Sequence, residues 1–122
     1  MKWKQLCEIA DTTVRAARKR LPAEVCPAAD GLPVTVEPWP SEAMLEDEGV
    51  ESDILGLFVG PDHGTDATAT MPPQILLFLE NLWDYAEGDE AVFREEVRIT
   101  YLHELGHYLG WDEDELTRRG LD

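Results

Sequence analysis

Apolar residues recur every three or four positions between residues 3 and 20. This spacing places them along one side of a helix, with charged residues on the other side. The stripe consists of Trp3, Leu6, Ile9, Ala10, Val14 and Ala17. Basic residues at 18–20 suit the negative end of the helix dipole, and Pro22 ends the helix. We therefore predict an amphipathic helix here, and we interpret the basic cluster as its end and not as a nucleic-acid patch.

Three apolar segments predict β-strands. Residues 33–37 and 53–59 are short apolar stretches with a strand-like composition, and prolines follow the first of them. Residues 74–80 form a continuous apolar run, which is typical of a strand buried on both faces. A loop rich in Gly, Pro, Thr and Asp covers residues 60–73.

Capping residues and breakers predict the remaining helices, which cover residues 42–48, 81–86, 90–109 and 112–119. Ser41 and Asp89 can cap the first and third of these. Gly110 is well placed for the left-handed conformation that often follows a helix. Helices and strands in this order predict an α+β fold, with helices packed on a small mixed sheet.

Length and charge narrow the possible functions. The 122 residues fit one domain, 1–122, whose 43% hydrophobic content supports a packed core. Ten Lys and Arg face 26 Asp and Glu, which gives a formal net charge of −16. Such an acidic chain is unsuited to the phosphate backbone of nucleic acids or to an anionic membrane surface. We expect neither kind of partner.

The N-terminal residues and the two cysteines indicate a cytoplasmic protein. No apolar stretch of the signal-peptide kind occurs near the N-terminus, and the longest apolar run is too short to span a membrane. Cys7 and Cys26 are too few and too far apart for a zinc knuckle or a redox pair. We therefore expect reduced thiols and a cytoplasmic location.

The strongest chemical signal is the sequence His103-Glu104-Leu105-Gly106-His107 within the long predicted helix. Histidines four residues apart project from one helix face, so both imidazoles can reach one metal ion. Zinc accepts imidazole nitrogen at about 2.0–2.1 Å, although iron, cobalt and nickel accept the same ligands. Glu104 lies beside this pair, where it can act as a general base in metal-assisted hydrolysis. Gly110 allows the chain to double back, so that a residue near position 113 can approach the same metal.

The run from His103 to Glu113 resembles the zincin metallopeptidases, because it reads H-E-x-x-H-x-x-G-x-x-E. The short chain, the strand at residues 55–58 and the helical tail look like the minimal zincin-like bacterial proteins. The resemblance implies zinc held by His103, His107 and a third ligand beyond the glycine. Members of that family usually have Asp at the position of Glu113. Glu113 is therefore the first candidate for the third ligand, with Asp112 and Asp114 as alternatives.

Other residues carry weaker signals. Glu96 and Thr100 fall on the helix face of His103, where they could orient a ligand, and Glu96 could equally be a solvated surface charge. Tyr108 could donate to an oxyanion, but packing explains it better. His63 in the loop could contact a substrate, although loop histidines are usually solvated. In zincins a strand like that at residues 54–59 pairs with an extended substrate, so the resemblance implies the same here.

These observations predict a zinc-dependent hydrolase, most simply a metallopeptidase that uses Glu104 to activate water. Its substrate would be a peptide or protein, and the acidic charge suggests a basic or partly unfolded one. The alternative is a zinc-binding interaction module with little or no catalysis, since the short chain leaves little room for the second half of a deep cleft. An open coordination position would favour the enzyme, and a closed site would favour the module.

Overall fold

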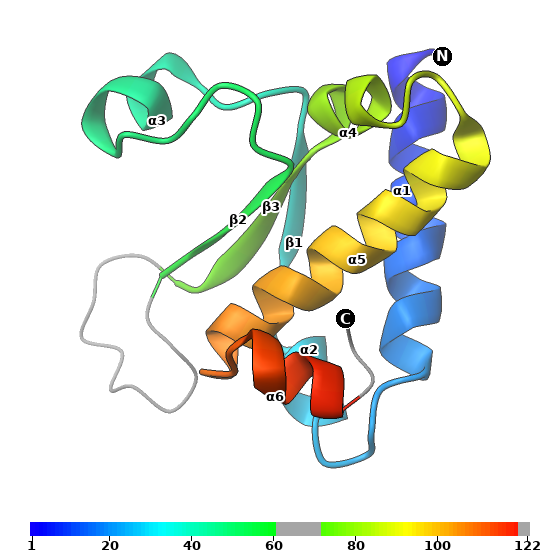
Figure 1. The fold of residues 1–122 in the computed structure, drawn as a ribbon, viewed down its shortest axis with the longest axis vertical. Helices are drawn as coiled ribbons and strands as arrows, with labels where there is room; N and C mark the ends of the chain where they lie inside the picture. Colours follow the sequence, from blue (N-terminus) through cyan, green and yellow to red (C-terminus); the bar gives the residue numbers. More distant parts are fainter. Residues whose placement is uncertain (61–71, 120–122) are drawn as a thin grey trace.

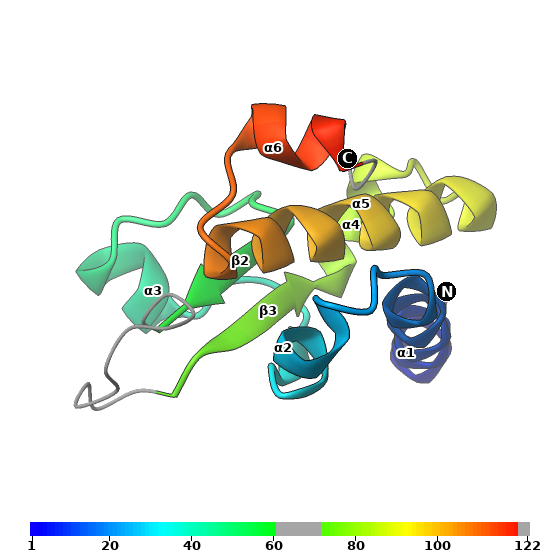
Figure 2. The same ribbon diagram turned by 90° about the horizontal axis from the view of Figure 1, so that it is seen from below.

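The computed structural model describes residues 1–60 and 72–119, except for the side chain of Glu113. A three-stranded sheet lies among six described helices (Figures 1 and 2). The helices are α1 (Trp3–Lys19), α2 (Cys26–Asp30), α3 (Glu42–Asp47), α4 (Leu79–Tyr85), α5 (Glu90–Tyr108) and α6 (Glu113–Arg118). The strands are β1 (Val34–Glu37), β2 (Gly56–Val59) and β3 (Gln74–Phe78). The predicted α+β fold with a small mixed sheet is confirmed.

The strand β3 occupies the centre of the sheet, in the order β1-β3-β2. It runs parallel to β1 and antiparallel to β2, with Phe58 opposite Ile75. Four consecutive residues of β3, from Ile75 to Phe78, are buried, as expected for a strand covered on both faces. The strand β2 is therefore an edge strand, and no described strand pairs with its outer side.

The helix α5 crosses one face of the sheet diagonally, and α1 packs beside it (Figure 1). Seen from below, α6 lies on the side of α5 away from α1 (Figure 2). The core between α1, α5 and the sheet includes Leu6, Ala10, Val14, Ile75, Leu77, Phe93, Val97, Tyr101 and Leu105. No helix in the described part of the chain, α5 included, is both long enough and apolar enough to cross a bilayer.

The helix caps confirm most of the predicted boundaries. The side chain of Ser41 accepts a hydrogen bond from the Met44 N–H, at 3.2 Å. The side chain of Asp89 accepts one from the Val92 N–H, at 3.1 Å. Gly110 adopts a left-handed conformation, with φ of 76°, directly after α5 and its cap. Local hydrogen bonding therefore sets the ends of these helices as the residue types predict.

The structure differs from the prediction at the start of β2, at the end of β3 and at α2. The strand β2 starts at Gly56 instead of residue 53. The Asn81 side chain on α4 donates to the Ser52 and Ile54 carbonyls, each at 2.9 Å. These bonds hold the segment before Gly56 against α4, so it does not extend the strand. Residues 79 and 80 begin α4 and do not extend β3. The helix α2 was not predicted, since five residues are too few to show a helical period. Its one signal is Pro27 in the first turn.

Candidate metal centre

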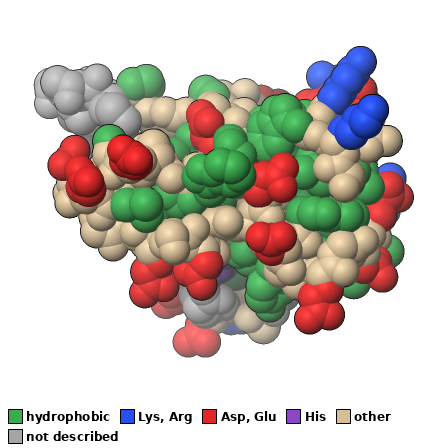
Figure 3. All heavy atoms as spheres, turned by 90° about the horizontal axis from the view of Figure 1, so that it is seen from above, with side chains coloured by type: hydrophobic (Ala, Val, Ile, Leu, Met, Phe, Trp, Pro, Cys, Tyr) green, Lys and Arg blue, Asp and Glu red, His purple; other side chains and the backbone are tan. Residues whose placement is uncertain are grey.

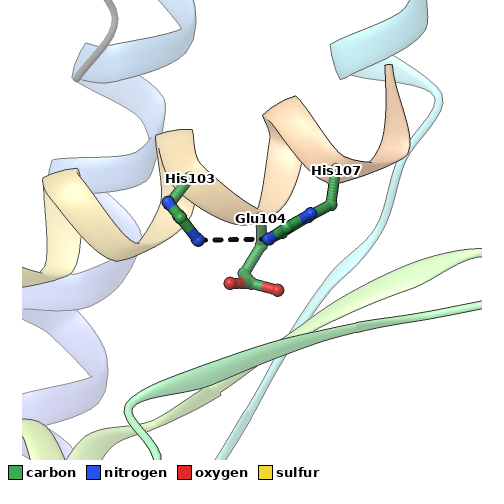
Figure 4. Close-up of side chains that lie close together, drawn as sticks. All are labelled: His103, Glu104 and His107. Atoms are coloured by element: carbon green, nitrogen blue, oxygen red, sulfur yellow. Dashed lines mark hydrogen bonds between the residues drawn. The ribbon is translucent and has the colours of Figure 1, made fainter. Parts of the chain in front are cut away.

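The C-terminal half of α5 brings His103, Glu104 and His107 together (Figure 4). The Nε2 atoms of the two histidines lie 3.1 Å apart, and their ring planes are 83° apart. One nitrogen from each imidazole and one oxygen of Glu104 all lie within 4.8 Å of one another. His107 is exposed and His103 is partly buried, so the group is accessible from solvent on one side.

The donor atoms fit a zinc ion. Ligands about 2.05 Å from a tetrahedral zinc lie about 3.3 Å from one another. The 3.1 Å between the two Nε2 atoms is close to that separation. Imidazole nitrogens and carboxylate oxygens are also among the donors that zinc accepts. The histidines can therefore occupy two neighbouring corners of one coordination tetrahedron.

The Glu104 carboxylate connects α5 to the edge strand β2. Its Oε1 accepts a hydrogen bond of 2.8 Å from the backbone N–H of Phe58. Residues of an antiparallel strand alternate between those bonded to the partner and those whose backbone groups point away from it. The Phe78 N–H donates to the Leu55 carbonyl, so Leu55 and every second residue after it face β3. The backbone groups of Gly56 and Phe58 therefore point to the open edge, and Glu104 stands at this edge.

The candidates for a third ligand lie at the start of α6. Asp112 caps this helix, and its side chain accepts a hydrogen bond of 2.9 Å from the Glu115 N–H. Neither Asp112 nor Asp114 belongs to the donor group around the two histidines. Glu113 is the first residue of α6, but its side chain lies outside the described part of the structure, as does His63.

Thr100 and Tyr108, two of the remaining candidates on α5, are in packing positions. Thr100 is buried, and a Cβ built on Gly56 would lie 2.5 Å from the Thr100 Cγ2 atom, so this side chain contacts β2. The Tyr108 ring lies 5.4 Å from the ring of Phe58, centroid to centroid. This arrangement agrees with the packing interpretation of Tyr108. Glu96 is partly buried, one turn before Thr100.

Sequence reasoning missed the backbone N–H of Phe58 as a partner of Glu104. A backbone donor cannot be recognised from the residue type, because every residue except proline carries one. The available signal was Gly56, since a glycine inside a strand often marks the close approach of another element. That approach is the contact with Thr100 on α5.

One comparison with known proteins bears on this site. A family model described as "Zincin-like metallopeptidase" matches residues 29–121, which is 93 of the 122 residues. The matched segment includes β2, the donor group on α5 and the start of α6. Among curated proteins, none matches the chain.

Proposed function

Since the chain belongs to the zincin-like metallopeptidase family, we propose that it is a zinc-dependent peptidase. The observation that carries the proposal is the 3.1 Å approach of two imidazole nitrogens beside a carboxylate at an open strand edge. We assign His103, His107 and Glu113 as the metal ligands. We assign Glu104 as the general base.

The roles of the side chains follow from their chemistry. Bound zinc supplies a Lewis acid that polarises the substrate carbonyl and lowers the pKa of water toward 7. Glu104 takes a proton from the attacking water and delivers it to the leaving amine. The Phe58 N–H holds one oxygen of this carboxylate, which fixes its orientation. The other oxygen can then carry the proton.

The open edge of β2 offers a binding place for an extended substrate. The Gly56 N–H, the Gly56 carbonyl and the Phe58 carbonyl all point to this edge, whereas the Phe58 N–H is already bonded to Glu104. A peptide that pairs with β2 gains main-chain hydrogen bonds without any demand on its sequence. Its backbone then lies next to the Glu104 carboxylate, which is where a peptide bond must be for hydrolysis.

The replacement Glu104→Gln tests the proposal. Gln has a similar shape but cannot accept the proton, so we expect zinc to stay bound and peptide hydrolysis to fall by at least about 100-fold. Zinc content after purification and cleavage of a mixed peptide library measure the two effects. The replacement His107→Ala should lower the zinc content itself.

The control is Glu95→Gln, a change of the same kind on an exposed face of α5. Glu95 pairs with Arg98 at the surface, so its loss should leave zinc content and hydrolysis unchanged. Full activity in Glu104→Gln would refute the role of Glu104. Stoichiometric zinc without hydrolysis of any peptide would instead favour the non-catalytic zinc-binding module.

A further inference from the structure

The helix α6 meets α5 through Leu116. Among the described side chains of α6, Leu116 is the one that is buried, with 2% of its surface exposed. It lies directly over Gly106, which is also buried. In the sequence, Gly106 stands between the two histidines. The contact therefore joins the short C-terminal helix to the segment that carries the candidate metal ligands.

The Leu116 side chain occupies the space that a side chain at position 106 would need. A Cβ built there would lie 2.6 Å from Leu116 Cδ2, 3.0 Å from Cδ1 and 3.1 Å from Cγ. Gly106 is in the middle of the helix, where alanine has the higher helix propensity. The local backbone thus gives no reason for glycine, and the reason is the space that Leu116 occupies.

The position of Gly106 places α6 beside the metal-binding face. Successive residues of a helix are about 100° apart around its axis. Gly106 therefore lies about 60° from His103 in one direction, and Glu104 lies about 100° from His103 in the other direction. Glu104 contacts β2 and Gly106 contacts α6, so the histidines lie between these two elements. The contact of α6 with α5 therefore lies on the side of the histidines opposite to Glu104.

The turn between the two helices is also fixed. The Trp111 N–H donates to the Gly106 carbonyl at 2.8 Å, and Gly110 takes the left-handed conformation that this turn needs. The Arg119 guanidinium lies over the Trp111 ring, 4.1 Å from its centroid, and Arg119 Nε is 2.7 Å from Glu115 Oε1. The turn after α5 and the end of α6 are thus both held by contacts with Trp111. These contacts restrict the start of α6 relative to α5.

We propose that the contact between Gly106 and Leu116 positions the start of α6 so that Glu113 completes the metal site. Gly106 and Leu116 are then positioning residues for the third ligand. This inference rests on the proposed function, because it takes the histidines and Glu113 as the ligands.

The test measures zinc affinity by competition with a chromophoric chelator. The replacement Gly106→Ala should push α6 away and weaken zinc binding about 10–100-fold, as expected when the support of a ligand is lost. The control is Gly31→Ala, whose new Cβ would meet its nearest described neighbours at 3.5 and 3.8 Å, an ordinary contact. This control should bind zinc like the wild type. Circular dichroism of the metal-free proteins checks that each variant is folded.

Two further variants separate positioning from general damage to α5. In a Glu113→Ala background the ligand is already gone, so adding Gly106→Ala should change the zinc affinity by less than about threefold. The replacement Leu116→Ala removes the buried side chain that holds α6 against Gly106, so it should also weaken zinc binding, and it should do so by less than about threefold in the Glu113→Ala background.

The outcomes distinguish this inference from the proposed function. If the wild type binds no zinc, the proposed function itself fails. If the wild type binds zinc and Gly106→Ala binds it equally well, the positioning role is wrong. The role is also wrong if Gly106→Ala weakens binding as much in the Glu113→Ala background as in the wild type.

Discussion

Arg18 is a single side chain that joins three separate segments of the fold. Its Nε donates to the Tyr101 hydroxyl at 3.1 Å, and its Nη2 donates to the Leu32 carbonyl at 3.0 Å. Tyr101 is fully buried on α5, and Leu32 precedes β1. The hydroxyl therefore gives Arg18 on α1 a hydrogen-bond partner inside the core, two residues before His103.

The replacement Tyr101→Phe should lower the free energy of unfolding by about 1 kcal/mol at pH 7, because Arg18 loses an acceptor. Burial raises the pKa of Tyr101 above its ordinary value near 10, although Arg18 opposes this shift. The unfolded chain thus releases this proton at a lower pH than the folded one. The stabilisation by Tyr101 is complete below about pH 10 and is lost as the pH rises further. The difference between wild type and variant should therefore shrink above pH 10.

Urea unfolding of both proteins from pH 7 to pH 11 measures this effect. The matched control is Tyr85→Phe, because the Tyr85 side chain is 61% exposed and should contribute little at any pH. A difference between wild type and Tyr101→Phe that stays constant up to pH 11 would show that the raised pKa of Tyr101 does not contribute to stability.

The sequence predicts the donor group well because its signal is local. The spacing of His103, Glu104 and His107 on a helix is enough to place them on one face, and the structure brings them together. The partner of Glu104 could not be predicted, because the Phe58 N–H comes from a strand 46 positions away. Gly106 is part of the motif, but the reason for a glycine at this position is the packing of α6 against α5, which the sequence does not show.

The contact between α5 and β2 depends on Gly56. A Cβ there would lie 2.5 Å from Thr100 Cγ2 and 3.1 Å from the Leu76 carbonyl oxygen. The replacement Gly56→Ala should therefore separate α5 from β2 and lower the free energy of unfolding by about 1–3 kcal/mol, the usual effect of overpacking. Urea unfolding measures this loss.

A second replacement shows whether the methyl of Thr100 causes the loss. Thr100→Ser removes Cγ2 and keeps the hydroxyl, so the double variant should regain part of the stability of Gly56→Ala. Gly31→Ala is again the control, since nothing described lies closer than 3.5 Å to its new Cβ. If the two replacements are simply additive, the crowding at Gly56 comes from the Leu76 backbone and not from Thr100.

Prediction of the elements succeeded where capping and periodicity agree. The helix α5 has both an Asp89 cap and Gly110 after its end, and its predicted range is correct to within one residue. The start of β2 was wrong because it depends on the side chain of Asn81, which follows the next strand along the chain. Long-range hydrogen bonds of this kind change the end of an element without changing its hydrophobic pattern.

The charges of the whole molecule are unevenly distributed. All ten Lys and Arg lie at residues 2–20, 94–98 and 118–119, whereas residues 21–93 contain 16 Asp and Glu and no Lys or Arg. Figure 3 shows acidic side chains spread over one face, with most of the visible Lys and Arg gathered at one corner. The edge strand β2 belongs to the segment without cations. We therefore expect a peptide that approaches this strand to enter a negative field.

This field should favour cationic peptides over neutral peptides of the same length. Attraction at a distance raises the rate of encounter, so kcat/KM for a Lys-containing peptide should fall severalfold between about 20 mM and about 500 mM NaCl, as the screening length shrinks from about 20 Å to about 4 Å. The matched peptide with Gln at the same positions should show little change. If the two peptides depend equally on salt, the excess of acidic residues has no part in substrate selection. Net charge then matters for solubility alone, and the choice of substrate must come from short-range contacts along β2.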